Sequence, residues 1–209
     1  MGKSIGLDIA ALVLLLILLV SSIVRKMTSG ISNRIFLIIM MTAIVATGFD
    51  IAAVSLDNME SDWISALYTA HAGYLFTHYL SVPLHLLFVI SLTDTWHKLR
   101  RNLWFAILLS IPLAVVLVAF VTNAANNKMF SVENGYQRGP LFGLMYGMTM
   151  FYTLFMVAYI IRYRKLFSIG QLIAISAIVP ISVFSMVIQM LYPTMLVEMF
   201  GGALSLLIV

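Results

Sequence analysis

The sequence predicts an all-α, polytopic membrane protein, a bundle of seven transmembrane helices that forms one domain over residues 1–209. Two observations carry this prediction. The chain is 62% hydrophobic and only 10% charged, which leaves too little polar surface for a soluble domain of this size. Apolar runs of about 20 residues, the length of helix that crosses a bilayer core, follow one another with short polar connections.

Six apolar runs are long enough to span a membrane: Ile5–Val24, Ile35–Leu56, Trp63–Leu92, Leu103–Thr122, Leu141–Ile161 and Ile169–Leu191. The first has no small-residue cleavage site before Arg25-Lys26, so we interpret it as a helix and not as a signal peptide. A seventh run follows Tyr192-Pro193 and is still apolar at Val209. It is too short to cross a core of about 30 Å. We therefore expect a truncated seventh helix, with its remainder and a cytoplasmic region missing.

The connections between the runs alternate in charge. Basic residues follow the first, third and fifth runs: Arg25, Lys26, Arg34, Lys98, Arg100, Arg101, Arg162, Arg164 and Lys165. The other connections carry most of the acidic residues, among them Asp57, Glu60, Asp62, Glu133 and Glu198. Because basic loops remain cytoplasmic, the pattern predicts an N-terminus outside the cell and a C-terminus in the cytoplasm. The net charge of +4 arises from these loops and does not indicate a nucleic-acid partner.

The connection between the fourth and fifth runs predicts a small extracellular β-hairpin. Its sequence, MFSVENGYQRGP, places Asn134-Gly135 between two short segments rich in strand-forming residues. Asn-Gly favours a type I′ turn because both residues tolerate a positive φ. Pro140 then marks the first turn of the fifth helix.

The predicted third helix carries a ridge of polar side chains. His71, His78 and His85 are spaced seven residues apart, nearly two helical turns, so they share one face of the helix. Tyr74 and Ser81 lie on the same face. Pro83 removes a hydrogen bond near His85 and would allow the helix to bend there.

Several kinds of site are excluded or disfavoured by the residue inventory. The chain has no cysteine, and none of its spans contains a lysine that would bind retinal. Neighbouring histidines on the third helix are about 10 Å apart along the axis, too far for one metal ion. The only other histidine, His97, lies in a loop, which excludes bis-histidine heme across two helices. No catalytic motif is present. We therefore predict no cofactor, no metal site and no enzymatic activity in residues 1–209.

Polar residues of the outer half remain as a candidate ligand pocket beneath the hairpin. Asp50 is either a ligand or proton site or a carboxylate at the membrane interface, and each histidine either lines a cavity or specifies helix packing. His85 is assigned to packing. The predicted pocket consists of Asp50, His71, Tyr74, His78, Tyr136, Arg138 and Gln189.

The segment FSVENGYQRGPLF, residues 130–142, resembles a motif of the N-terminal seven-transmembrane sensor regions of bacterial histidine kinases and GGDEF diguanylate cyclases. Gly135, Tyr136, Arg138, Gly139 and Pro140 carry the likeness. Thr77-His78 with Pro83-Leu84, Ser91-Leu92-Thr93 and the Gln189-x-Leu191-x-Pro193 turn add to it. The resemblance implies a multi-pass protein of the bacterial cytoplasmic membrane that feeds a C-terminal cytoplasmic output domain. It also implies a homodimer.

The sequence thus predicts a sensory module that detects an extracellular or membrane-borne signal, with membrane lipid and a small-molecule or lipid ligand as partners. Ligand binding would bias the helix arrangement, and the seventh helix would pass that bias to the kinase or cyclase. The alternative is a small transporter or proton-coupled channel that uses Asp50 and the histidine ridge. Inverted repeats and paired broken helices would favour the alternative, and the sequence has neither.

Overall fold

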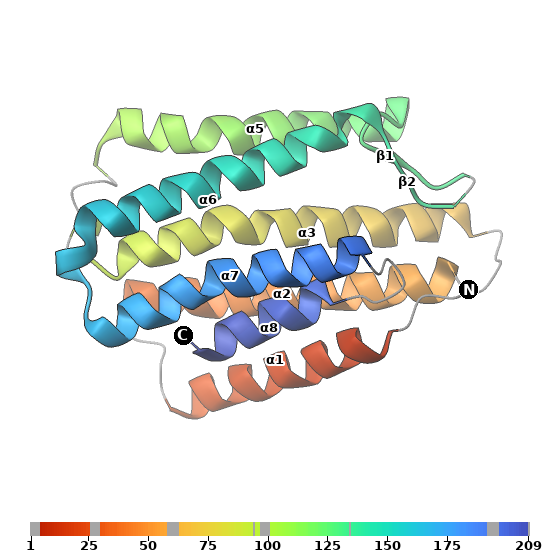
Figure 1. Ribbon diagram of the computed structural model, residues 1–209. Helices are drawn as coiled ribbons and strands as arrows, with labels where there is room; N and C mark the ends of the chain where they lie inside the picture. The colour runs from red at the N-terminus through yellow and green to blue at the C-terminus, as the bar shows by residue number, and fades with distance from the viewer. Residues whose placement is uncertain are drawn as a thin grey trace. The chain divides into compact units, whose positions relative to one another are not determined.

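The computed structural model describes residues 5–25, 30–57, 63–93, 95–96, 101–133, 135–191 and 197–208. Almost all of this chain is helical (Figure 1). The α-helices are α1 (Gly6–Val24), α2 (Ile31–Asp57), α3 (Ile64–Ser91), α5 (Leu103–Asn126), α6 (Gly143–Tyr163), α7 (Ile169–Leu191) and α8 (Glu198–Ile208). Two short 3₁₀ turns, η1 (Pro140–Phe142) and η2 (Arg164–Leu166), flank α6. Each of the six long apolar runs of the sequence is a helix.

Five segments within the described residues are long and apolar enough to cross a membrane: Gly6–Val24, Ile31–Asp57, Ile64–Ser91, Leu103–Asn126 and Pro140–Leu166. Large apolar side chains remain exposed along them, such as Val121 on α5, which is 75% exposed. Exposed apolar surface of this extent suits contact with lipid. The protein is therefore a helical bundle of membrane type. The count of seven spans remains a prediction, since neither α7 nor the 11-residue α8 is among these five segments. The orientation also remains a prediction.

The chain forms two compact units, one built from residues 1–81 with 167–209 and the other from residues 82–166. The boundary falls within α3, beside Pro83. In the first unit, α8 packs against α7, α1 and α2. Gly201 makes the α7–α8 contact close, because a Cβ at this position would overlap the side chain of Ser185.

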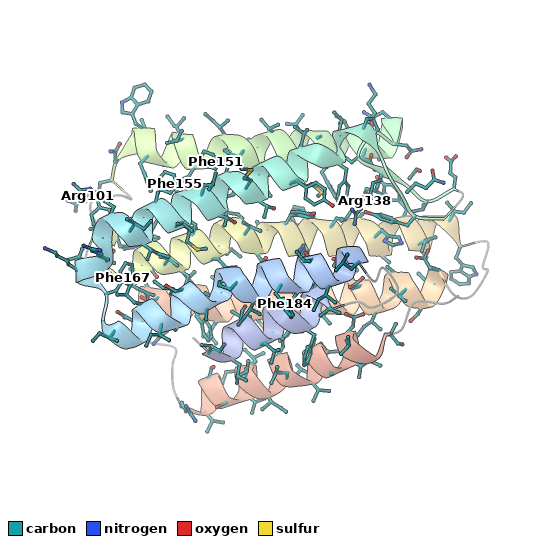
Figure 2. The ribbon with its side chains drawn as sticks, in the orientation of Figure 1. Arg101, Arg138, Phe151, Phe155, Phe167 and Phe184 are labelled. Atoms are coloured by element: carbon teal, nitrogen blue, oxygen red, sulfur yellow. The ribbon has the colours of Figure 1, made fainter. Side chains whose placement is uncertain are left out.

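In the second unit, α5 packs along α6. Phe151 and Phe155 project from α6 towards α5 (Figure 2), and the rings of Phe155 and Phe105 are 5.8 Å apart. The buried Tyr152 of α6 donates a 2.5 Å hydrogen bond to the carbonyl of Leu109 on α5. Pro112 lacks the N–H that would bond the carbonyl of Leu108, so the helical hydrogen bonding of α5 is interrupted one residue before the carbonyl that Tyr152 binds.

The connection between α5 and α6 contains a two-stranded antiparallel ladder. β1 (Phe130–Ser131) pairs with β2 (Gln137–Arg138), with Phe130 opposite Arg138. Gly135 has a φ of +80°, the left-handed conformation that a tight turn requires. Asn134, the other predicted turn residue, lies outside the described residues. The side of the membrane on which these strands lie remains a prediction.

One buried side chain, that of Asn123 in α5, holds this connection in place. Its Oδ1 accepts hydrogen bonds from the backbone N–H groups of Met129 (2.6 Å) and Phe130 (3.2 Å), and its Nδ2 donates to the carbonyl of Phe130 (3.0 Å). Asn123, Met129 and Phe130 are all fully buried. Asn123 therefore satisfies backbone groups that would otherwise be buried without partners.

Candidate functional site

The polar ridge predicted on the third helix is present on α3. The hydroxyls of Thr77 and Ser81 donate hydrogen bonds to backbone carbonyls of the same helix. The acceptors are Gly73 and His78 respectively, each at 2.6 Å. These two bonds remain within α3. Among the described residues of the ridge, His71 and His78 each reach a carboxylate on another helix.

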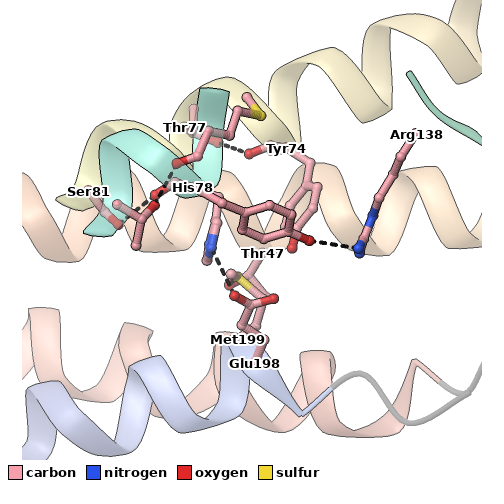
Figure 3. Close-up of polar contacts among 11 residues, drawn as sticks. Thr47, Tyr74, Thr77, His78, Ser81, Arg138, Glu198 and Met199 are labelled. Carbon is pink, nitrogen blue, oxygen red and sulfur yellow. Dashed lines mark hydrogen bonds and ion pairs between the residues drawn. The ribbon is translucent and has the colours of Figure 1, made fainter. Parts of the chain in front are cut away.

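His78 joins α3 to α8. Its Nε2 lies 3.2 Å from a carboxylate oxygen of Glu198, the first residue of α8 (Figure 3). The imidazole stacks on Tyr74, with ring centroids 5.5 Å apart, and contacts the edge of Tyr79. Two aromatic rings on α3 therefore fix the orientation of the imidazole that meets Glu198.

His71 makes a second link within the same unit. Its Nε2 lies 3.4 Å from a carboxylate oxygen of Asp57, the last residue of α2. The imidazole is buried and the carboxylate is mostly so. This pair joins the last residue of α2 to the second turn of α3. His71 therefore has a partner on another helix, in addition to its predicted place in a pocket wall.

Asp50 lies on the buried face of α2, with 8% of its surface exposed. It is close enough to His78 for their charges to interact. One turn earlier, the buried Thr47 contacts the sulfur of Met199 on α8 at 3.6 Å. Gly73 of α3 lies so close to Phe49 that a Cβ there would be 2.6 Å from the ring. Asp50 thus lies in the interior of the first unit, and whether it is a ligand site or an interfacial carboxylate stays a prediction.

Asp8 is a functional candidate that the sequence did not reveal. It lies in the first turn of α1 with none of its surface exposed, and neither carboxylate oxygen has a hydrogen-bond partner among the described residues. Its charge interacts with that of Asp50. From sequence alone, one carboxylate near the start of a span resembles an interfacial residue. Glu198, assigned to an outer connection, is likewise part of this interior cluster.

Four of the predicted pocket residues of the first unit lie on α2 and α3, namely Asp50, His71, Tyr74 and His78, and the structure adds Asp8 and Glu198 to them. We refer to Asp8, Asp50, His78 and Glu198 as the interior cluster. It draws one residue each from α1, α2, α3 and α8.

Tyr136 and Arg138 belong to the second unit. Arg138 donates a 2.7 Å hydrogen bond to the hydroxyl of Tyr146, and its guanidinium lies 4.9 Å from the centre of the Phe142 ring. The Tyr136 ring packs 6.1 Å from that of Phe130. These contacts give both residues a role in holding β1 and β2 against the start of α6. Their place in a ligand pocket stays a prediction.

Gln189 lies in the last turn of α7, and its side chain is outside the described part of the structure. His97, Tyr192 and Pro193 are also outside it. His85 lies in the second unit and is half-buried. Among the described residues, no group of three or more histidine, aspartate or glutamate side chains could hold a metal ion.

The chemistry available in the interior cluster is charge pairing inside an apolar bundle. It provides three carboxylates and one imidazole, and the imidazole is paired with Glu198. Such a cluster can shift its own pairing when one of its groups gains or loses a proton, because buried charges are stabilised by a partner. Comparison with protein-family models, curated proteins and solved structures gives no match for this chain.

Proposed function

We propose that the protein is a transmembrane sensory module of the bacterial cytoplasmic membrane. It detects an extracellular or membrane-borne signal and relays it through the last helix to a cytoplasmic histidine kinase or GGDEF output domain. Lipid and a small-molecule or lipid ligand are its proposed partners, and the chain itself has no proposed catalytic role. The proposal follows the resemblance of residues 130–142 to such sensor regions.

The observation that supports the proposal best is the contact between His78 and Glu198. His78 belongs to the polar ridge of α3, whereas Glu198 begins α8, the last helix along the chain. A change in the charge or position of His78 would therefore act directly on α8. A signal can shift a helix only if it stabilises one arrangement over another, and a half-buried pair of ionisable groups between two helices provides such a difference.

Thr47 and Gly201 support the same interpretation. Thr47 contacts Met199, one residue after Glu198, so α2 also meets the start of α8. Gly201 brings α8 directly against Ser185 of α7. Because α8 is closely packed on several sides, it would move in discrete steps and not by continuous deformation.

The reading frame that follows Val209 in the natural gene tests this proposal. We expect a kinase or diguanylate cyclase core to follow within a short distance. A stop codon soon after Val209 would instead leave the module without an output and contradict the proposal.

The second candidate, a small transporter or proton-coupled channel, is favoured by one observation: Asp8 is fully buried, and its carboxylate has no hydrogen-bond partner among the described residues. Buried ionisable groups within spans are typical of proton and ion pathways. Flux measurements in proteoliposomes separate the two functions. The sensory proposal expects no solute or proton flux, and flux that disappears in Asp50→Asn would favour the transporter.

A further inference from the structure

The end of the second unit at which α5 begins and α6 ends carries a group of exposed basic side chains. The two helices pack in opposite directions, and the rings of Phe105 and Phe155 are 5.8 Å apart. Arg101 precedes Phe105 by about 6 Å along the helix axis, and Arg162 follows Phe155 by about 10 Å towards the same end (Figure 2). The η2 turn adds two more cations. We refer to these residues as the basic patch: Arg101, Arg162, Arg164 and Lys165.

No acidic side chain in the described part of the second unit neutralises the basic patch. All four side chains are exposed, and none of them forms an ion pair among the described residues. The described acidic residue of this unit is Glu133, which lies in the connection at the other end of α5. Residues outside the described part include Asp94, Lys98 and Arg100. Within the described residues, this end of the unit therefore carries positive charge alone.

Large apolar side chains lie directly beside these cations. Trp104, in the first turn of α5, is 80% exposed, and Leu103 next to it is exposed as well. Leu166 is exposed and follows Lys165. Tryptophan next to arginine and lysine is typical of the level at which a membrane helix passes through the lipid headgroups. Phosphate groups lie at that level, so the cations can meet phosphate while their apolar neighbours meet acyl chains.

Hydrogen bonds brace the helix ends that carry the basic patch. The hydroxyl of the buried Tyr159, three residues before Arg162, lies 2.5 Å from Oγ1 of Thr93. Thr93 in turn lies 2.7 Å from Oγ1 of Thr95. These bonds join the residues that follow α3 to the last turns of α6 within the same unit. The backbone from which Arg162 projects is therefore held by the protein itself, before any ligand binds.

We propose that the basic patch, with Trp104 beside it, is a binding site for the headgroup of an anionic phospholipid. Arginine donates two parallel hydrogen bonds to a phosphate, and Lys165 adds a further positive charge. A zwitterionic lipid fits less well, because its headgroup carries a cation that the patch would repel. The inference deepens the lipid partnership of the proposed function. It rests on the proposed membrane location and not on signalling.

The test uses the full chain reconstituted in bilayers, with Trp104 as the fluorescent reporter. Trp63→Phe and Trp96→Phe leave it as the single tryptophan. Trp63 is 68% exposed, and the indole N–H of Trp96 has no hydrogen-bond partner among the described residues, so both changes should be tolerated. The vesicles consist of phosphatidylcholine with a small, equal fraction of brominated phosphatidylglycerol or brominated phosphatidylcholine. Bromine on the acyl chains quenches a tryptophan that it contacts.

We expect phosphatidylglycerol to quench Trp104 more strongly than phosphatidylcholine, by about twofold or more at equal fraction. Arg101→Gln combined with Arg164→Gln should lose most of this excess, whereas Arg101→Lys combined with Arg164→Lys should keep more of it because the charge remains. Arg34→Gln combined with Lys128→Gln is the matched control. It removes two exposed cations that lie outside the basic patch, and it should keep the full excess.

Equal quenching by the two lipids in the reporter protein would overturn the proposal. An equal loss in the control variant would do the same, because the excess would then follow the net charge of the chain. Inorganic phosphate at matched ionic strength should leave the excess unchanged, and its loss in phosphate would replace the lipid with a free anion. If Trp96→Phe does not fold, the comparison uses Trp63→Phe alone, in which Trp104 is the more exposed tryptophan.

The lipid site and the sensory function fail separately. Absence of a phosphatidylglycerol excess removes the lipid site and leaves the link between His78 and Glu198 untouched. A stop codon soon after Val209 removes the sensory function and leaves the lipid site in place.

Discussion

The imidazole of His78 lies 3.2 Å from the carboxylate of Glu198, across 120 positions of the sequence, and joins the middle of α3 to the first residue of α8. Both side chains are half-buried, at 19% and 30% exposure. A charge pair in this position is costly to break from one side only, because the remaining group keeps its burial and loses its partner.

We expect His78→Ala and Glu198→Gln each to destabilise the protein by about 1–3 kcal/mol. The double variant should lose less than the sum of the two, since the groups act on each other. Thermal and denaturant unfolding in detergent measures the three variants. Thr69→Ala on α3 is the control, because its hydroxyl is exposed and bonds only its own helix. Strictly additive losses would show that the two residues do not interact.

Gly201 should be intolerant of even one added methyl group. A Cβ at this position overlaps the Oγ of Ser185, so Gly201→Ala should force α7 and α8 apart and cost about 1–3 kcal/mol. Combining it with Ser185→Gly should restore much of the loss. Gly202→Ala is a matched control one residue away, where nothing lies within 4 Å of the added Cβ. Equal unfolding temperatures for the two alanine variants would contradict the close contact of α7 with α8.

Asn123→Ala should loosen the connection between α5 and α6. The substitution leaves the buried N–H groups of Met129 and Phe130 without their acceptor, at a cost of about 1–3 kcal/mol. Asn123→Asp keeps the acceptor but places a buried carboxylate oxygen opposite the Phe130 carbonyl oxygen, so we expect a loss at least as large. Limited proteolysis of residues 127–139 provides the readout. Thr122→Ala, next in sequence but exposed, should match wild type, and cleavage rates equal in all four proteins would disprove the anchoring role.

Single-cysteine labelling tests the predicted orientation cleanly, because the natural chain contains no cysteine. A membrane-impermeant maleimide applied to intact cells should label Lys128→Cys, in the connection that carries β1 and β2. It should leave Lys165→Cys unlabelled until the cells are permeabilised. The opposite pattern would place the N-terminus in the cytoplasm and remove the basis for an extracellular pocket.

The helices could be predicted from the sequence because about 20 consecutive apolar residues leave few alternatives to a buried or lipid-facing helix. Their ends differ from the apolar runs, since helical hydrogen bonding continues through polar residues. α2 begins at Ile31, directly after Gly30 with its φ of +92°, although the apolar run begins at Ile35. α5 continues beyond Thr122 to Asn126 and ends where Asn127 adopts the left-handed conformation.

The interior cluster was predicted only in part. Asp50 and His78 were identifiable because ionisable groups inside a span are rare. Asp8 and Glu198 were missed because each lies near the start of an apolar run, a position where carboxylates usually meet water or the helix N-terminus. Burial of these two residues depends on how α1 and α8 rotate and pack, and hydrophobic spacing does not fix the rotation of a helix that is apolar on all sides.

Output activity of the full gene product in native membranes tests the central claim most directly. Autophosphorylation or cyclic-di-GMP synthesis would be compared between wild type, Glu198→Gln and Gly202→Ala at matched protein amounts. If α8 relays the state of α3, Glu198→Gln should change the output several-fold while Gly202→Ala should match wild type. Equal output from all three proteins, or a gene product with no such activity, would contradict the account.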